Sequence, residues 1–179
     1  MPGEEQLRSE GAQTLESSGQ YATFYVDGLY CGVAVLRVQE VLRPQHMTRV
    51  PLAPPLIQGL INLRGQIVTA IDMRRRLRLT ERTRDHAPMN LVVQGEGRAV
   101  SLLVDEIGDV IELGGDTFET PPGNLTPEQR RMIAGIHKLE GRLLLVLDID
   151  RVLQLDDVMQ PAPSMEPKEC EIGARKSYD

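Results

Sequence analysis

The chain has 179 residues, 41% of them hydrophobic and 26% charged, which is enough for one globular domain or two small ones with real cores. Its formal net charge of −6 at pH 7 argues against a polyanionic partner. The longest aliphatic run, residues 143–147, is far shorter than the roughly 20 residues of a membrane-spanning helix, and the N-terminal residues lack the pattern of a signal peptide. We therefore expect a cytoplasmic protein with no direct membrane insertion.

The first element along the chain is a predicted disordered tail, residues 1–19, which is rich in Glu, Gly, Ser and Gln and has no aromatic residue. A β-hairpin follows, with strands at residues 21–26 and 30–35 around an Asp27-Gly28 turn. Cys31 falls within the second strand, and with no CxxC pair in the chain it is expected to be a small buried hydrophobic residue.

A second hairpin is predicted further along the first half. Residues 36–42 are interpreted as a helical turn that leads past Pro44 into a short strand near residues 48–50. After the proline-rich corner at 51–55, two strands at 60–63 and 67–72 flank the turn Arg64-Gly65.

The next segment, RRRLRLTERTR, runs from Arg74 to Arg84 and carries six arginines against one glutamate. Such a run could touch nucleic acid or an acidic protein face. However, no aromatic residues are interleaved for base stacking. We therefore interpret it as a short solvated helix followed by a linker.

The second half of the chain repeats the first. Residues 56–79 match residues 132–155 without gaps at an offset of 76, and VQEV at 38–41 matches VDEI at 104–107 at an offset of 66. The matched positions include Gly59 with Gly135 and Asp72 with Asp148. The difference in offset requires about ten extra residues in the second half, which we place in a long loop at 113–129.

These elements predict a mainly β fold with short helices. About five short antiparallel strands per half, with glycines at the corners, indicate two small closed barrels, approximately residues 20–80 and 88–156. Because a barrel of this size is marginal alone, the two should share a core, with strands 67–71 and 143–147 at their junction. Residues 157–179, which include three prolines among mixed charges, are predicted to form a mobile tail.

No pattern in the sequence indicates an enzyme, a cofactor or a metal site. His46, His86 and His137 occur in unrelated contexts and are expected to be incidental surface or hairpin residues. Nucleotide-binding loops and a nucleophile elbow are missing. Asp72 and Asp148 each end a strand before a helical segment, so we interpret both as helix N-caps rather than catalytic carboxylates.

The two hairpin turns differ in charge, since Arg64 precedes Gly65 in the first and Glu140 precedes Gly141 in the second. If both halves build the same turn, the turn itself does not require the arginine, and Arg64 becomes a candidate for contact outside its hairpin. Glu40 is its expected ionic partner, whereas the equivalent residues Glu106 and Glu140 have like charges. Val38, Val41 and Ile67 are candidate apolar contacts for a partner protein.

Three segments carry a family resemblance: VQEVL at 38–42, GLINLRGQIVTAIDMRRRL at 59–77 and LLVDEIGDVI at 102–111. Together they resemble the CheW family of chemotaxis coupling proteins over essentially all of residues 20–156. The resemblance implies two intertwined five-stranded SH3-like barrels that share a hydrophobic core. Thr69 and Ala70 depart from the family pattern, since such proteins often carry a proline there.

The same resemblance implies a non-enzymatic adaptor that joins the cytoplasmic tips of chemoreceptors to the regulatory domain of a CheA-type histidine kinase. Arg64 and Glu40 would belong to the partner-binding surface, as would the motif residues Gly59, Asn62 and Gly65. Two alternatives remain open from the sequence: a coupling protein of a twitching-type or surface-sensing pathway, and a small β-barrel nucleic-acid-binding protein that uses residues 74–84.

Overall fold

The fold is described from a computed structural model, which places residues 19–83 and 85–155. The two predicted tails, residues 1–19 and 157–179, lie outside these described residues except for Gly19, which begins the first strand. Short helices accompany the strands. The strands are β1 (Gly19–Val26), β2 (Leu29–Ala34), β3 (Val38–Leu42), β4 (Ile57–Leu63), β5 (Gln66–Asp72), β6 (Met89–Gln94), β7 (Ala99–Val104), β8 (Glu106–Leu113), β9 (Phe118–Glu119), β10 (Ile133–Leu139) and β11 (Arg142–Leu147); the helices are α2 (Met73–Arg76), α3 (Pro127–Met132) and α4 (Ile149–Leu153), with 3-10 turns η1 (Val35–Arg37) and η2 (Gly115–Thr117).

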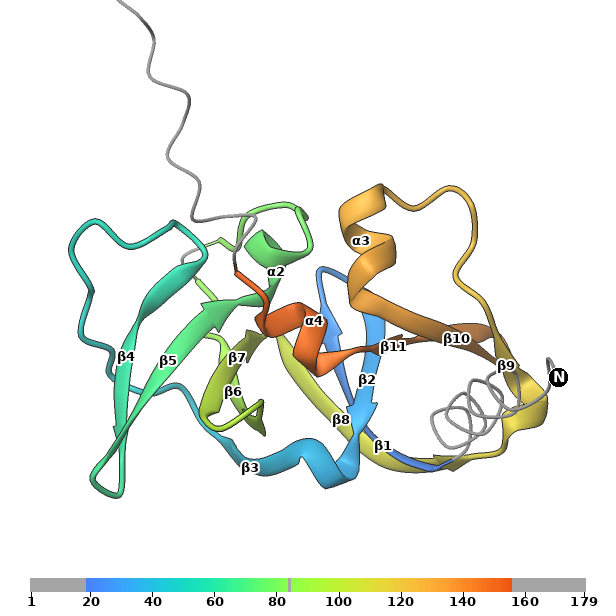
Figure 1. The fold of residues 1–179 in the computed structure, drawn as a ribbon, viewed down its shortest axis with the longest axis horizontal. Coiled ribbons are helices and arrows are strands. Elements are labelled where there is room, and N and C mark those ends of the chain that lie inside the picture. The colour runs from blue at the N-terminus through green and yellow to red at the C-terminus, as the bar shows by residue number, and fades with distance from the viewer. Residues whose placement is uncertain (1–18, 84, 156–179) are drawn as a thin grey trace, which may run out of the picture.

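The strands form two sheets that lie side by side as two barrels (Figure 1). One sheet has five strands in the order β3-β6-β7-β5-β4, and the other has six in the order β8-β1-β2-β11-β10-β9. The first hairpin of each half lies in the sheet that contains the later strands of the other half. Hairpin β1–β2 belongs to the six-stranded sheet, and hairpin β6–β7 belongs to the five-stranded sheet. The predicted pair of intertwined SH3-like barrels is confirmed, although one sheet has six strands and not five, because the short strand β9 adds to its edge. The ranges 20–80 and 88–156 mark the repeats but not the sheets, because each sheet contains strands from both.

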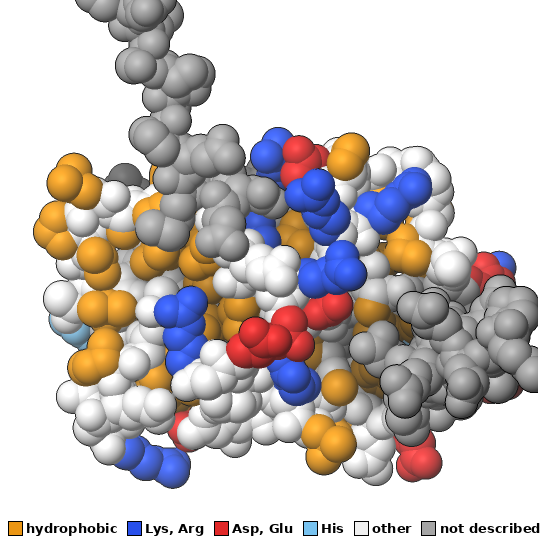
Figure 2. Space-filling model, viewed as in Figure 1, with side chains coloured by type: hydrophobic (Ala, Val, Ile, Leu, Met, Phe, Trp, Pro, Cys, Tyr) orange, Lys and Arg blue, Asp and Glu red, His pale blue; other side chains and the backbone are white. Residues whose placement is uncertain are grey.

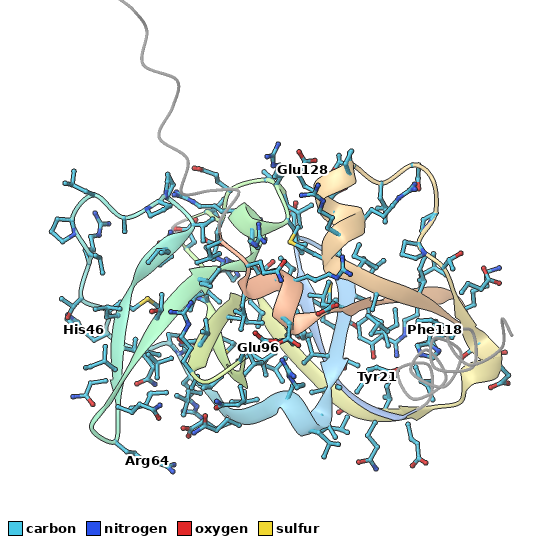
Figure 3. All side chains as sticks on the ribbon, in the orientation of Figure 1. Tyr21, His46, Arg64, Glu96, Phe118 and Glu128 are labelled. Carbon is cyan, nitrogen blue, oxygen red and sulfur yellow. The ribbon has the colours of Figure 1, made fainter. Side chains whose placement is uncertain are left out.

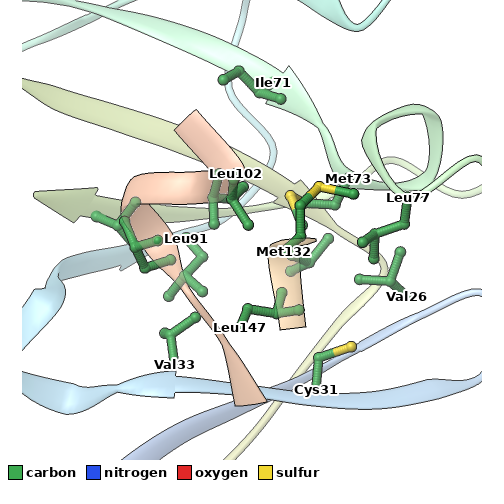
Figure 4. Packing of buried hydrophobic residues seen from close by; sticks show 14 of the residues in the cluster. Val26, Cys31, Val33, Ile71, Met73, Leu77, Leu91, Leu102, Met132 and Leu147 are labelled. Atoms are coloured by element: carbon green, nitrogen blue, oxygen red, sulfur yellow. The ribbon is translucent and has the colours of Figure 1, made fainter. Parts of the chain in front are cut away.

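The exchange creates one parallel pairing in each sheet, β5 with β7 and β11 with β2. The strands predicted at the junction are therefore interior strands. Their later residues, such as Ile71 and Leu147, are buried in a core that both sheets share (Figure 4). Their first apolar residues, Ile67 and Leu143, are exposed instead, because these ends of the strands project beyond the core.

The helical turn predicted at residues 36–42 was wrong. Only η1 is helical there, and the next five residues form strand β3, which pairs with β6. Burial in β3 alternates between half-buried and exposed positions, as a two-residue period requires. The spacing of apolar residues fitted both the helical period of about 3.6 residues and the strand period of two, and pairing with the distant strand β6 decided between them.

The repeated glycines mark equivalent bulges. A register shift lies beside Gly59 in the β4–β5 pair and beside Gly135 in the β10–β11 pair. A Cβ on Gly59 would lie 2.6 Å from the carbonyl oxygen of Thr48, whose backbone bridges to Leu60. The short strand predicted near residues 48–50 is reduced to this bridge. In the second half the ring of Phe118 on β9 covers Gly135 in the same way.

We predict that Gly59→Ala lowers the free energy of unfolding by about 1–3 kcal/mol, because the added methyl forces the Thr48 backbone away. The backbone of Gly59 also has φ +158°, which L-residues rarely adopt. Urea unfolding of the purified variant measures the change. Gly123→Ala is the matched control, because a Cβ there meets only the end of the Arg130 side chain at 3.8 Å. Equal stability of the two variants would contradict the steric account.

The two predicted helix N-caps are confirmed. The Asp72 carboxylate accepts hydrogen bonds from the backbone N–H groups of Arg74 and Arg75 at the start of α2. The Asp148 carboxylate accepts one from the N–H of Arg151 at the start of α4. These bonds satisfy N–H groups that a helix leaves unpaired, so both aspartates have structural roles. No helix within the described residues is long and apolar enough to cross a membrane.

The arginine-rich segment contains the predicted short helix, α2, but it is only partly solvated, because Arg74 and Arg82 join the two barrels. The Arg74 guanidinium donates from Nε to Asp105 at 3.0 Å and lies 3.1 Å from a carboxylate oxygen of Asp27. Arg82 donates to the same Asp105 carboxylate at 3.0 Å. These side chains are mostly buried, and they join the β1–β2 turn to the start of β8. Arg84 lies outside the described residues.

Asp105 is the common acceptor in this cluster. Burial alone would raise the pKa of its carboxyl, but hydrogen bonds from Arg74, the Asp27 backbone N–H and Arg82 outweigh burial and lower it. In turn, the hydrogen bond to Asp105 raises the pKa of the Arg74 guanidinium. Both groups are therefore charged at neutral pH, and the cluster is a set of ion pairs that connects the two repeats.

Candidate protein-binding surface

The candidate partner residues all lie in the five-stranded sheet. Strand β3 carries Val38, Glu40 and Val41, and the β4–β5 hairpin carries the others. Figure 3 shows Arg64 at the tip of this hairpin, pointing away from the body of the molecule. The hairpin residues are Gly59, Asn62, Arg64, Gly65 and Ile67.

The predicted ion pair between Arg64 and Glu40 is present. The Arg64 guanidinium lies 3.3 Å from a carboxylate oxygen of Glu40. The Arg64 side chain is 88% exposed, whereas that of Glu40 is 20% exposed. The pair joins the edge strand β3 to the turn that follows the opposite edge strand β4. An exposed pair of this kind contributes only about 0–1 kcal/mol to stability, so the arginine remains available to a partner.

The two hairpin turns are not the same, contrary to the expectation from the repeat. Arg64 has φ 51° and Gly65 has φ 87°, so both central residues of the first turn have positive φ, as in a type I′ turn. In the second turn Gly141 has φ 75°, but Glu140 does not have a positive φ. Asn62 supports the first turn, because its side-chain oxygen accepts a hydrogen bond from the N–H of Gly65 at 2.9 Å.

The conformation of Arg64 is unusual for its side chain. Glycine or asparagine normally fills this left-handed position, and an arginine there costs roughly 1–2 kcal/mol. The arginine is thus held at a position that the turn itself would give to another residue type. This strain supports a role for the Arg64 side chain beyond its own hairpin.

Two of the three apolar candidates are accessible. Ile67 is 61% exposed and Val41 is also exposed, whereas Val38 is half-buried and packs against the core. Gly59 is buried beneath the Thr48 backbone and has a structural role. The candidate site therefore consists of Arg64 and Glu40, and Ile67 and Val41 are exposed apolar residues of the same sheet.

Sequence reasoning missed other exposed apolar side chains. Leu36 in η1, Leu52 in the proline-rich corner and Val110 on β8 are all exposed. No sequence signal distinguished them, because apolar residues in a strand or turn are ordinarily assigned to the core. Val110 pairs with Ala22 of β1, so the exposed apolar surface also includes part of the six-stranded sheet.

Residues 20–157 match the family described as CheW-like domain. The chain belongs to this family. The curated CheW chemotaxis protein of Bacillus subtilis (strain 168) is 30% identical over 83% of this chain and 96% of its own length. The CheW chemotaxis protein of Klebsiella aerogenes is 28% identical over 80% of this chain and 87% of its own. The crystal structure of scaffolding protein TtCheW from Thermoanaerobacter tengcongensis has a TM-score of 0.69 at 24% identity and covers 76% of this chain and 93% of that one, which supports the shared fold.

The histidines of this CheW-like domain do not form a reactive site. His46 and His86 are exposed, as expected. His137 lies in the β10–β11 hairpin but is fully buried, so only its assignment as an incidental surface residue was wrong. Its ring lies edge-on between Tyr21 and Phe118, and Nδ1 is 2.8 Å from the Thr117 hydroxyl. Burial lowers the pKa of the His137 imidazole, although Asp116 acts in the opposite direction. His137 is therefore a neutral core residue.

The Cys31 thiol and the acidic side chains also do not form a reactive or metal-binding site within the described residues. Cys31 is buried, and burial raises the pKa of its thiol to about 12, so it is the small hydrophobic residue that the sequence predicted. Within residues 19–83 and 85–155, no cluster of three His, Cys, Asp or Glu side chains could hold a metal ion. The candidate functional feature of this CheW-like domain is therefore the surface around Arg64 and Glu40.

Proposed function

We propose that this chain is a non-catalytic adaptor that couples chemoreceptors to a CheA-type histidine kinase in chemotaxis signalling. The observation that carries the proposal is the Arg64–Glu40 pair, with Arg64 exposed on a strained turn, in a sheet of a CheW-like domain that also exposes Val41 and Ile67. Such a surface offers a charged group for orientation and apolar area for affinity.

The kinase contact is assigned to the five-stranded sheet. Its edge strand β3 carries Glu40 and the exposed Val41, and the β4–β5 hairpin carries Arg64 and Ile67. The regulatory domain of the kinase would dock on these residues, and the receptor tip would contact the same adaptor while the kinase is bound. Recruitment from the cytoplasm to membrane-associated receptor arrays would follow from the receptor contact.

The nucleic-acid alternative is not favoured. Arg74 and Arg82 are engaged by Asp105, and Arg76 donates to backbone carbonyls of Val152 and Gln154 at 2.8 and 2.7 Å. Arg74 and Arg82 are neutralised by a carboxylate of the protein itself, and Arg76 is held by backbone carbonyls, so the segment does not present a continuous row of arginines to a phosphate backbone.

We expect Ile67→Glu to weaken binding of a CheA-type regulatory domain by about tenfold or more, because a charge would replace apolar area within the contact. Isothermal titration of the purified adaptor with that domain measures the loss. Leu143→Glu is the matched control, since Leu143 holds the equivalent place in the other barrel and is 52% exposed. If Ile67→Glu bound the kinase domain as tightly as the wild type, the assignment of the kinase contact to the five-stranded sheet would be contradicted.

A further inference from the structure

A basic pocket of about 340 Å³ lies between α2, α3 and α4. Figure 2 shows basic side chains gathered over these helices, beside the point where the described chain ends. Only one acidic side chain, Glu128, is among the described residues that line the pocket. The lining arginines are Arg75, Arg76, Arg78, Arg131 and Arg151.

The arginines are arranged around the pocket by separate contacts. Arg76 is fixed by the carbonyls at the end of α4, whereas Arg78 lies 3.6 Å from Glu128 across the opening. Arg75 forms an ion pair with Glu81, and Arg151 forms one with Asp148. Glu81 and Asp148 do not line the pocket. Among the described residues, the lining itself holds the five guanidinium groups and the single carboxylate of Glu128. Planar guanidinium groups favour carboxylate and phosphate oxygens as ligands.

Arg78 shows the same conformational feature as Arg64. It follows α2 with φ 55°, a position that glycine usually occupies at the end of a helix. Its side chain is largely exposed, so no core packing explains why an arginine is present there.

The end of α4 leads directly into an acidic segment. Gln154 lines the pocket, and the next residues after Leu155 are Asp156 and Asp157. The segment 156–179 contains six acidic residues against three basic ones. The acidic residues are Asp156, Asp157, Glu166, Glu169, Glu171 and Asp179.

We propose that the basic pocket is a binding site for an acidic peptide and that this chain's own residues 156–179 occupy it. Surface ion pairs are individually weak, at about 0–1 kcal/mol each. Attachment at the rim of the pocket offsets this weakness, because a short tether gives an effective concentration in about the millimolar range. An unattached acidic peptide would need higher affinity to compete.

The pocket is independent of the adaptor surface. Figure 3 shows Glu128, at the pocket, and Arg64, at the tip of the β4–β5 hairpin, on opposite sides of the molecule. Occupation of the pocket by residues 156–179 therefore leaves the proposed kinase contact uncovered.

Cys170 allows a direct test in the full chain. It lies between Glu169 and Glu171, while the other cysteine, Cys31, is buried and unreactive. A nitroxide label on Cys170 should broaden the amide signals of pocket residues, such as Arg78, Glu128 and Arg151, in a ¹H–¹⁵N spectrum at low salt. We expect this broadening to disappear at high salt and in the double variant Arg78→Gln, Arg151→Gln. The control Arg43→Gln, Arg98→Gln removes the same charge at two other exposed positions and should keep the broadening.

Several outcomes would overturn the proposal. Pocket signals that stay sharp would show that residues 156–179 do not occupy the site. Broadening that survives the pocket substitutions while the spectrum remains that of the folded protein would remove its electrostatic basis. In a mixing experiment, nitroxide-labelled chains without ¹⁵N are combined with ¹⁵N chains that carry no nitroxide. Broadening in this mixture would assign the occupant to a second copy instead.

Discussion

Arg64→Glu is expected to disrupt assembly of the receptor–adaptor–kinase complex while leaving the fold intact. The substitution replaces a guanidinium that lies 3.3 Å from a carboxylate oxygen of Glu40 with a second carboxylate, at a side chain that is 88% exposed. Repulsion at a binding surface costs far more than the loss of a surface ion pair. We expect at least about a tenfold loss of affinity for the kinase regulatory domain, and a melting temperature close to that of the wild type.

Glu140→Arg is the matched control, because Glu140 precedes the glycine of the equivalent hairpin in the other barrel. Glu140 lacks the positive φ of Arg64, and it has the same charge as Glu106, the residue that is equivalent to Glu40 in the repeat. Its effect on assembly should be much smaller. Co-sedimentation of receptor, adaptor and kinase, together with thermal unfolding of each isolated variant, gives both readouts. Equal assembly defects, or melting of the protein by Arg64→Glu alone, would contradict the assignment of Arg64 to the partner surface.

Asp105→Asn should produce the largest loss of stability of any single substitution proposed for this chain. It leaves the mostly buried guanidinium groups of Arg74 and Arg82 without their shared carboxylate. Breaking a buried ion pair on one side costs about 3–5 kcal/mol, and partial exposure here reduces the expected loss to about 2–4 kcal/mol. Thermal and urea unfolding measure it. Asp109→Asn, an equal change of charge at an exposed position nearby, should have little effect.

The same cluster predicts a pH dependence. Because the pKa of Asp105 is lowered in the folded state, its stabilisation is complete above the ordinary carboxyl pKa and is lost as pH falls through the folded value. The stability difference between wild type and Asp105→Asn should therefore be constant near neutral pH and shrink below about pH 4. His137 titrates in both proteins and cancels in this difference. A difference that did not change on acidification would exclude an ionic role for Asp105.

Local sequence signals predicted much of the fold for identifiable reasons. Asp27-Gly28 and Arg64-Gly65 specify tight turns, and Asp72 and Asp148 mark helix starts, because each of these features depends on neighbouring residues alone. The exchange of hairpins could not be predicted in this way, since the pairing of β2 with β11 joins residues more than a hundred positions apart. Strand β3 was missed for the same reason.

The candidate site shows the same division. The Arg64–Glu40 pair was predictable because the repeat placed unlike charges at one hairpin and like charges at the other. The ion-pair cluster around Asp105 was not predictable, because Asp27, Arg74 and Arg82 are brought to Asp105 only by the fold. Which apolar residues are exposed, such as Val110, also depends on sheet edges that the sequence does not mark.

The central claim, that this chain couples receptors to a histidine kinase, is tested most directly by reconstitution. Receptor-containing membranes and a CheA-type kinase would be combined with or without the purified adaptor, and kinase autophosphorylation would be measured. We predict strong receptor-dependent activation only when the adaptor is present, with loss of activation for Arg64→Glu and retention for Glu140→Arg. Activation that is unchanged by adding the folded adaptor, together with no binding to either partner, would contradict the account.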